Sequence, residues 1–138
     1  MTAEEYINQQ CDAFLETCQE MNFTHDWIYT LDDVAKLDEA TDQALATIWP
    51  EGTPKELENS AAIMWGSMFS KMIAGTYVSR WSVDPESKTP IVVVKCGQQA
   101  LQFKAILIGA QAFNNGTHFR KIADELIEHF DSQGAEKA

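Results

Sequence analysis

Apolar residues recur at helical spacing through the first fifty residues of the chain. A helix is predicted over residues 3–21, because Thr2 and Glu5 form a capping-box pattern and an apolar stripe follows. The stripe consists of Ile7, Cys11, Phe14, Leu15, Cys18 and Met21. A second helix is predicted from about Leu31, with Val34, Leu37, Leu45 and Ile48 on its inner face. Because the connector over residues 22–29 is short, we expect the two helices to form an antiparallel pair.

The most strongly apolar segment follows a break at residues 50–53. Thr53, Pro54 and Glu56 are typical of a helix start, and the third helix is predicted to continue to about Ala74. Its apolar residues form two adjoining stripes, Met64, Met68 and Met72 beside Trp65, Phe69 and Ile73. So wide an apolar surface indicates a central helix that contacts several other elements.

The second half of the chain changes to strand-like patterns. Residues 76–83 and 90–95 are rich in β-branched and aromatic side chains, and residues 84–88 form a turn between them. Residues 97–113 fit either a strand or a helix, and a helix over residues 101–113 is favoured. Asn114, Asn115 and Gly116 should end that helix. A last helix is predicted over residues 118–131, capped by Thr117, before a polar tail that should fray.

These elements predict an α+β fold: two N-terminal helices, a central helix packed on a β-hairpin or small antiparallel sheet, and two C-terminal helices. At 138 residues the chain is expected to form a single domain over residues 1–138, with residues 131–138 as the frayed tail. A chain of this length can bury enough apolar surface to fold without metal ions or disulfides.

The charge of the chain is concentrated in its N-terminal half. The net charge is −11, and residues 1–60 contain 14 acidic residues against two basic ones. Residues 61–138 are close to neutral. Such a field repels nucleic acid and anionic lipid and favours a basic protein partner. The alternative is that the acidic residues simply solvate the outer faces of two amphipathic helices.

Three cysteines and one long apolar segment bear on the cellular compartment. An odd number of cysteines without metal-ligand spacing indicates buried free thiols in a reducing cytoplasm. The N-terminus lacks the pattern of a signal peptide. Residues 61–78 approach the length of a membrane-spanning helix, but Lys71 lies in the middle of the segment. A buried helix is therefore expected, with no membrane association and a cytoplasmic location.

The search for chemistry finds no reactive constellation. The chain has no glycine-rich phosphate loop, nucleophile elbow or zinc-ligand spacing, so no catalytic residue, metal site or cofactor is predicted. His25 and Cys96 are the residues that a small enzyme could use, although neither has a partner evident from the sequence. Asp32 and Asp33 fall in the first turn of a predicted helix, where carboxylates interact favourably with the helix dipole.

The segment over residues 66–94 resembles a family of small bacterial domains of unknown function. The similarity is carried by residues 66–73 (GSMFSKMI), 79–83 (SRWSV) and 90–94 (PIVVV), with weaker likeness at residues 30–39 and 115–116. It extends over about residues 27–130. Some members look like immunity or toxin-neutralising proteins, which implies a binding role. The family's helix usually carries Gly and Glu where this chain has Ser70 and Lys71, so a function of that glutamate would be missing here.

A non-enzymatic domain that occludes a basic target protein, as an immunity or inhibitor protein does, is the favoured hypothesis. The carboxylates expected to bind the partner are Asp12, Glu16, Glu20, Asp32, Asp38, Glu39 and Asp42. One alternative is a small enzyme with a cleft between the third helix and the sheet. Another is a homo-oligomeric structural protein in which an exposed edge strand pairs with its copy.

Overall fold

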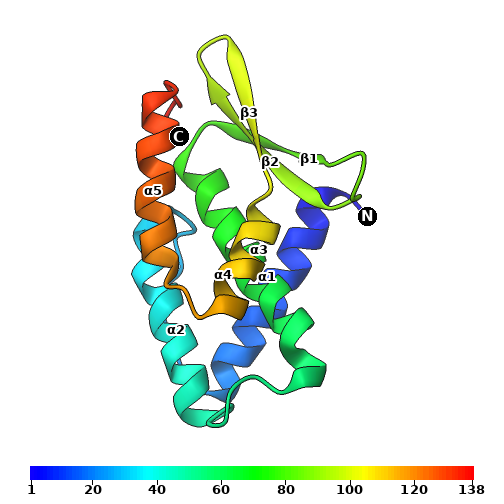
Figure 1. Ribbon diagram of the computed structural model, residues 1–138, viewed down its shortest axis with the longest axis vertical. Helices are drawn as coiled ribbons and strands as arrows, with labels where there is room; N and C mark the ends of the chain where they lie inside the picture. The colour runs from blue at the N-terminus through cyan, green and yellow to red at the C-terminus, as the bar shows by residue number, and fades with distance from the viewer.

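The computed structural model describes residues 1–138 and contains five α-helices and a three-stranded antiparallel sheet (Figure 1). In chain order the elements are α1 (Ala3–Glu20), α2 (Val34–Thr47), α3 (Glu58–Thr76), β1 (Ser79–Val83), β2 (Pro90–Cys96), β3 (Gln99–Phe103), α4 (Ala105–Asn115) and α5 (Phe119–Ser132). The predicted α+β class is confirmed. The sheet lies at the end of the molecule where both chain termini are found (Figure 1).

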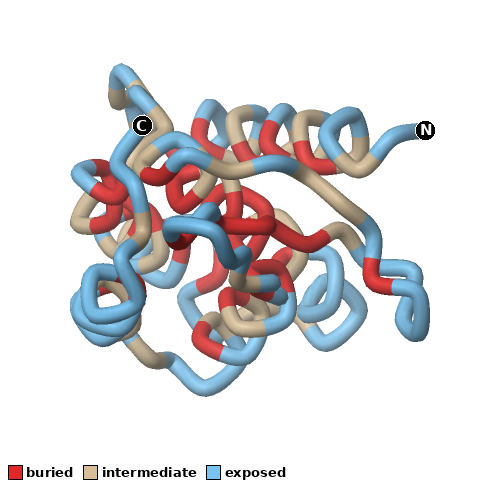
Figure 2. The backbone as a smooth tube through the Cα atoms, turned by 90° about the horizontal axis from the view of Figure 1, so that it is seen from above, coloured by how far each residue is buried: buried red, intermediate tan, exposed pale blue.

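The central helix α3 organises the core, as its wide apolar surface predicted. Trp65, Met68, Phe69, Met72 and Ile73 are all fully buried, within one cluster of 28 buried residues. Buried segments run through the middle of the molecule and exposed ones surround them (Figure 2). No helix combines the length and the apolar character that crossing a bilayer requires.

Two glycines allow α4 to pack closely against α3. A Cβ atom on Gly66 would lie 2.6 Å from the carbonyl oxygen of Ile106, and one on Gly109 would lie 2.6 Å from the Cα of Gly66. Both distances are shorter than any ordinary Cβ contact. The two backbones can approach this closely only because neither residue has a side chain.

The predicted antiparallel pairing of the first two helices is wrong. The 18-residue α1 is about 27 Å long, and the connector over residues 22–30 is extended enough to span about 30 Å. The carbonyl of Met21 accepts a hydrogen bond from Gln43 near the end of α2, whereas the Leu31 N–H donates to Thr76 at the end of α3. The connector therefore runs back along α1, and α1 and α2 point in the same direction.

The sheet has one more strand than the hairpin predicted from residues 76–95. Residues 99–103 pair with β2 from Cys96–Gln99 to Val92–Phe103, so the predicted helix over residues 101–113 begins only at Ala105. Gly97, with a φ of +62°, makes the tight turn between the two strands. The end of α4 follows the prediction, because Gly116 adopts the left-handed conformation.

The C-terminal tail is not frayed. Val78 N–H donates to the carbonyl of Glu136, and Glu136 N–H donates to the carbonyl of Lys95. Lys137 also lies over the ring of Tyr77, with its Nζ 4.4 Å from the ring centroid. The tail is ordered because it pairs with the backbone where β1 and β2 meet.

The start of α3 also differs from the prediction. Thr53 makes no capping hydrogen bond, and a 3₁₀ turn over Lys55–Leu57 precedes the first α-helical residue, Glu58.

Candidate functional site

The exposed face of α1 carries three carboxylates, Asp12, Glu16 and Glu20. Their spacing of four residues places them within about 80° of arc on the helix surface. The sequence of α1 contains no lysine or arginine, and none of the three takes part in an ion pair. Glu20 is in the last turn, where the helix dipole disfavours negative charge. No ion pair within the protein therefore neutralises this acidic stripe.

The remaining four candidate carboxylates follow Thr30 in and just before α2. Asp32 and Asp42 are exposed and unpaired, whereas Glu39 Oε2 lies 2.8 Å from Lys36 Nζ. Because α1 packs mainly against α3 and α2 mainly against α5, the seven residues form two separate groups.

Asp38 has a structural role that the sequence did not reveal. Its two carboxylate oxygens accept the N–H groups of Phe119 at 2.7 Å and Arg120 at 3.1 Å. Asp38 therefore caps the N-terminus of α5, where Thr117 was the predicted cap. The partner lies 81 residues away in the chain, and no local pattern could have identified it.

A buried polar cluster fixes the connector between α1 and α2. Asp33 is 3% exposed and accepts hydrogen bonds from the N–H groups of Ile28 and Tyr29, each at 2.8 Å. His25 Nε2 lies 2.8 Å from its other oxygen. Tyr29 has a φ of +58°, which is unusual for a bulky side chain. The buried carboxylate thus holds an unfavourable backbone conformation in place.

The three cysteines are free and buried, as predicted. Burial raises the pKa of Cys11 to about 12 and that of Cys18 to about 11. Both thiols therefore remain protonated near neutral pH, and a protonated thiol is a poor nucleophile.

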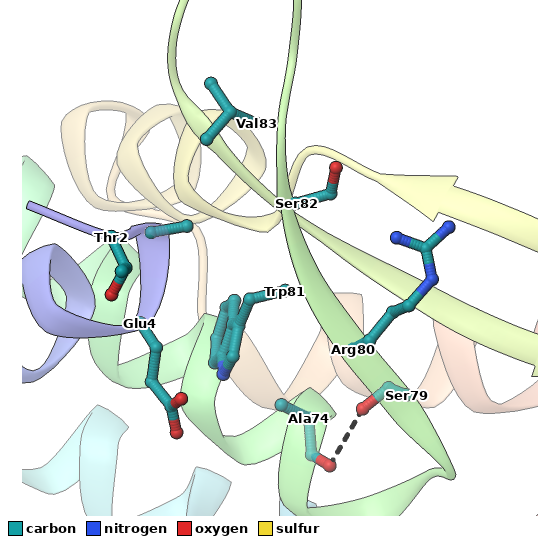
Figure 3. Close-up of a pocket in the computed structure, with 9 residues that line it drawn as sticks. Thr2, Glu4, Ala74, Ser79, Arg80, Trp81, Ser82 and Val83 are labelled. Atoms are coloured by element: carbon teal, nitrogen blue, oxygen red, sulfur yellow. Dashed lines mark hydrogen bonds between the residues drawn. The ribbon is translucent and has the colours of Figure 1, made fainter.

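A cleft of about 760 Å³ lies between the first turn of α1, the end of α3 and β1. Glu4, Ala74 and Trp81 line it, together with the other residues of β1 (Figure 3). The cleft lies between α3 and the sheet, where the alternative hypothesis of a small enzyme placed its active site. Neither His25 nor Cys96 lines it. Of the residues that line the cleft, Thr2 gave only a helix-capping signal in the sequence and Glu4 gave none.

The described residues include no group of three or more His, Cys, Asp or Glu side chains arranged to hold a metal ion. The geometry therefore offers two surfaces, the acidic stripe on α1 and the cleft beside β1. Comparisons with protein-family models, curated proteins and solved structures found no match, so the resemblance to small bacterial domains stays a prediction.

Proposed function

We propose that the protein is a non-enzymatic binding domain whose acidic stripe on α1 (Asp12, Glu16 and Glu20) docks on a basic protein. Occlusion of that partner would make it an immunity or inhibitor protein. The observation that carries the proposal is that no cation of the chain forms an ion pair with the stripe.

Like charges four residues apart on a helix destabilise it by roughly 0.2–0.5 kcal/mol per pair. The stripe contains two such pairs and adds an unfavourable charge at the helix C-terminus. Lysine or arginine residues of a partner would remove this repulsion on binding. A surface of one sign also accelerates encounter with a partner of the opposite sign.

The carboxylates around α2 contribute to the same field. Asp32, Glu39 and Asp42 are exposed and can reach a partner directly. Asp38 adds negative charge while its oxygens remain engaged with α5. A cytoplasmic location is proposed on the ground that all three cysteines are buried free thiols, which suit a reducing compartment.

The test compares two variants with the same change of charge. Asp12→Asn/Glu16→Gln/Glu20→Gln removes the stripe on α1. Asp124→Asn/Glu125→Gln/Glu128→Gln removes three exposed carboxylates from α5 and is the matched control. Each immobilised protein is used to capture partners from a lysate of the source organism, followed by mass spectrometry.

Wild type and the α5 variant should retain the same basic protein in stoichiometric amount, and the α1 variant should lose it. Thermal unfolding should show the α1 variant to be at least as stable as wild type, because repulsion has been removed. Equal retention by all three proteins would contradict the proposal, as would the absence of any basic protein.

A further inference from the structure

The outer edge of β1 has no partner in the protein. β1 pairs only with β2, and Val83 lies opposite Pro90, which has no N–H group. Because hydrogen-bonded and non-bonded pairs alternate along an antiparallel ladder, Arg80 and Ser82 bond to β2. The backbone N–H and C=O groups of Ser79, Trp81 and Val83 then point to the free edge.

This edge opens onto the cleft beside α1, which continues into an apolar cavity of about 350 Å³. The two share Thr2, Ala3 and Val83 as lining residues. Tyr6, Ile63, Pro90 and Ile106 are among the residues that line the apolar cavity. Val83 is 45% exposed at the junction. A free hydrogen-bonding edge therefore lies beside a groove made of the cleft and the adjoining apolar cavity.

The edge lacks two of the features that commonly protect a strand from pairing, although β1 is short and carries the charged, exposed Arg80. The segment Ser79–Val83 contains no proline, and its register with β2 is continuous, without a bulge. Natural edge strands are commonly blunted by such features. Its five residues span about 17 Å, which is enough for a short extended segment to pair along its length.

We propose that the free edge of β1 binds an extended peptide segment, which adds to the sheet as a fourth strand. The segment carries a lysine or arginine that lies between the Trp81 ring and the Glu4 carboxylate. An apolar residue two positions away enters the cavity beside Val83. Side chains two residues apart point to the same face of a strand, which accounts for this spacing.

The cation is specified by two groups in the cleft. Glu4 is exposed and forms no ion pair, and its side chain extends to the same side of β1 as the Trp81 indole (Figure 3). Arg80 points away from both (Figure 3). A cation at this place would gain from the carboxylate and from the aromatic face.

A second copy of the chain fits this edge less well. Antiparallel pairing of two β1 strands would bring Ser79, Trp81 and Val83 of each copy together, and none of these is cationic. Glu4 would stay unneutralised, and two chains of net charge −11 would repel one another. The chemistry of the groove thus favours a basic, extended partner segment over self-pairing.

The test uses a displayed library of random dodecapeptides selected against the wild-type chain. Val83→Pro removes an edge N–H without touching a bond to β2, and a proline is tolerated at this kind of position. Val83→Thr keeps the N–H and is the matched control, and Glu4→Gln removes the charge. Enriched peptides should carry Lys or Arg two positions from an apolar residue. They should bind Val83→Pro and Glu4→Gln at least tenfold more weakly than wild type and Val83→Thr.

Hydrogen exchange on the wild-type protein provides a reading that does not depend on any variant folding. The amides of Trp81 and Val83 should exchange quickly in the free chain and become protected when a selected peptide is added. Peptides that bind all four proteins equally, or that leave these amides unprotected, would overturn the proposal. Concentration-dependent dimerisation that Val83→Pro abolishes would also overturn it, because a second copy would then occupy the edge.

Discussion

Replacing Asp33 should be among the most destabilising single changes in this protein. Its carboxylate accepts two backbone N–H groups, from Ile28 and Tyr29, in addition to its contact with His25. Hydrogen bonds to a buried charged group contribute about 1.5–3 kcal/mol each. Asp33→Ala leaves both N–H groups without an acceptor, whereas His25 is partly exposed and can bond to water.

The two lost backbone bonds give an expected destabilisation of about 3–6 kcal/mol. At this chain length Tm should therefore fall by about 10–20 °C. The assay is chemical and thermal unfolding of wild type, Asp33→Ala and Asp33→Asn. The asparagine variant keeps one acceptor oxygen and should lose less than the alanine variant.

Asp32→Ala is the matched control, because Asp32 is the exposed neighbour. Its cost should stay within about 0.5 kcal/mol. A loss below about 1 kcal/mol for Asp33→Ala would refute the reasoning. The strained conformation of Tyr29 would then be held by other contacts.

Three further changes test separate parts of the structure. Asp38→Ala should destabilise the protein by about 1 kcal/mol in urea unfolding, because α5 loses its cap. An unchanged free energy of unfolding would contradict the capping role. Gly75→Ala should cost more than about 2 kcal/mol or prevent folding, since its Cβ would lie 1.9 Å from the Tyr29 carbonyl oxygen; a stable variant would contradict this packing. Asp84→Asn should destabilise at neutral pH, with the difference from wild type shrinking in acid.

The pH dependence at Asp84 has a defined sign. Bonds from Ser87, Lys104 and the Glu86 N–H lower its pKa from 3.8 to about 2. A carboxyl group with a lowered folded-state pKa stabilises the fold above its ordinary pKa. That contribution disappears as pH falls from 3.8 to about 2. Unfolding measurements across this range should show wild type and Asp84→Asn converging, and a constant difference would contradict the assignment.

Local patterns in the sequence predicted those elements whose signals are local. The capping box of Thr2 and Glu5 is present, and the apolar stripes of α3 are buried. Residues 101–103 were predicted to be helical because Phe103 fits a strand period with Leu101 and also a helical period with Ile106. The turn at Gly97 decides between a helix and a strand here, because it brings this segment alongside β2 for pairing.

Features that depend on distant contacts could not be predicted in the same way. The direction of α2 follows from an extended connector held by Asp33, a contact that no spacing rule indicates. The order of the tail follows from backbone pairing near Val78 and Lys95. The exposure of the candidate carboxylates could be inferred from the amphipathic pattern of the helices. The capping role of Asp38 could be recognised only from the folded structure.

The association rate between the protein and its captured basic partner, measured as a function of salt concentration, tests the role of the acidic stripe most directly. For wild type the rate constant should fall by at least about tenfold between low and high salt, because steering by opposite charges is screened. Asp12→Asn/Glu16→Gln/Glu20→Gln should flatten that dependence, while the α5 control keeps it. A rate independent of salt, or the same dependence in all three proteins, would contradict a binding role for the stripe.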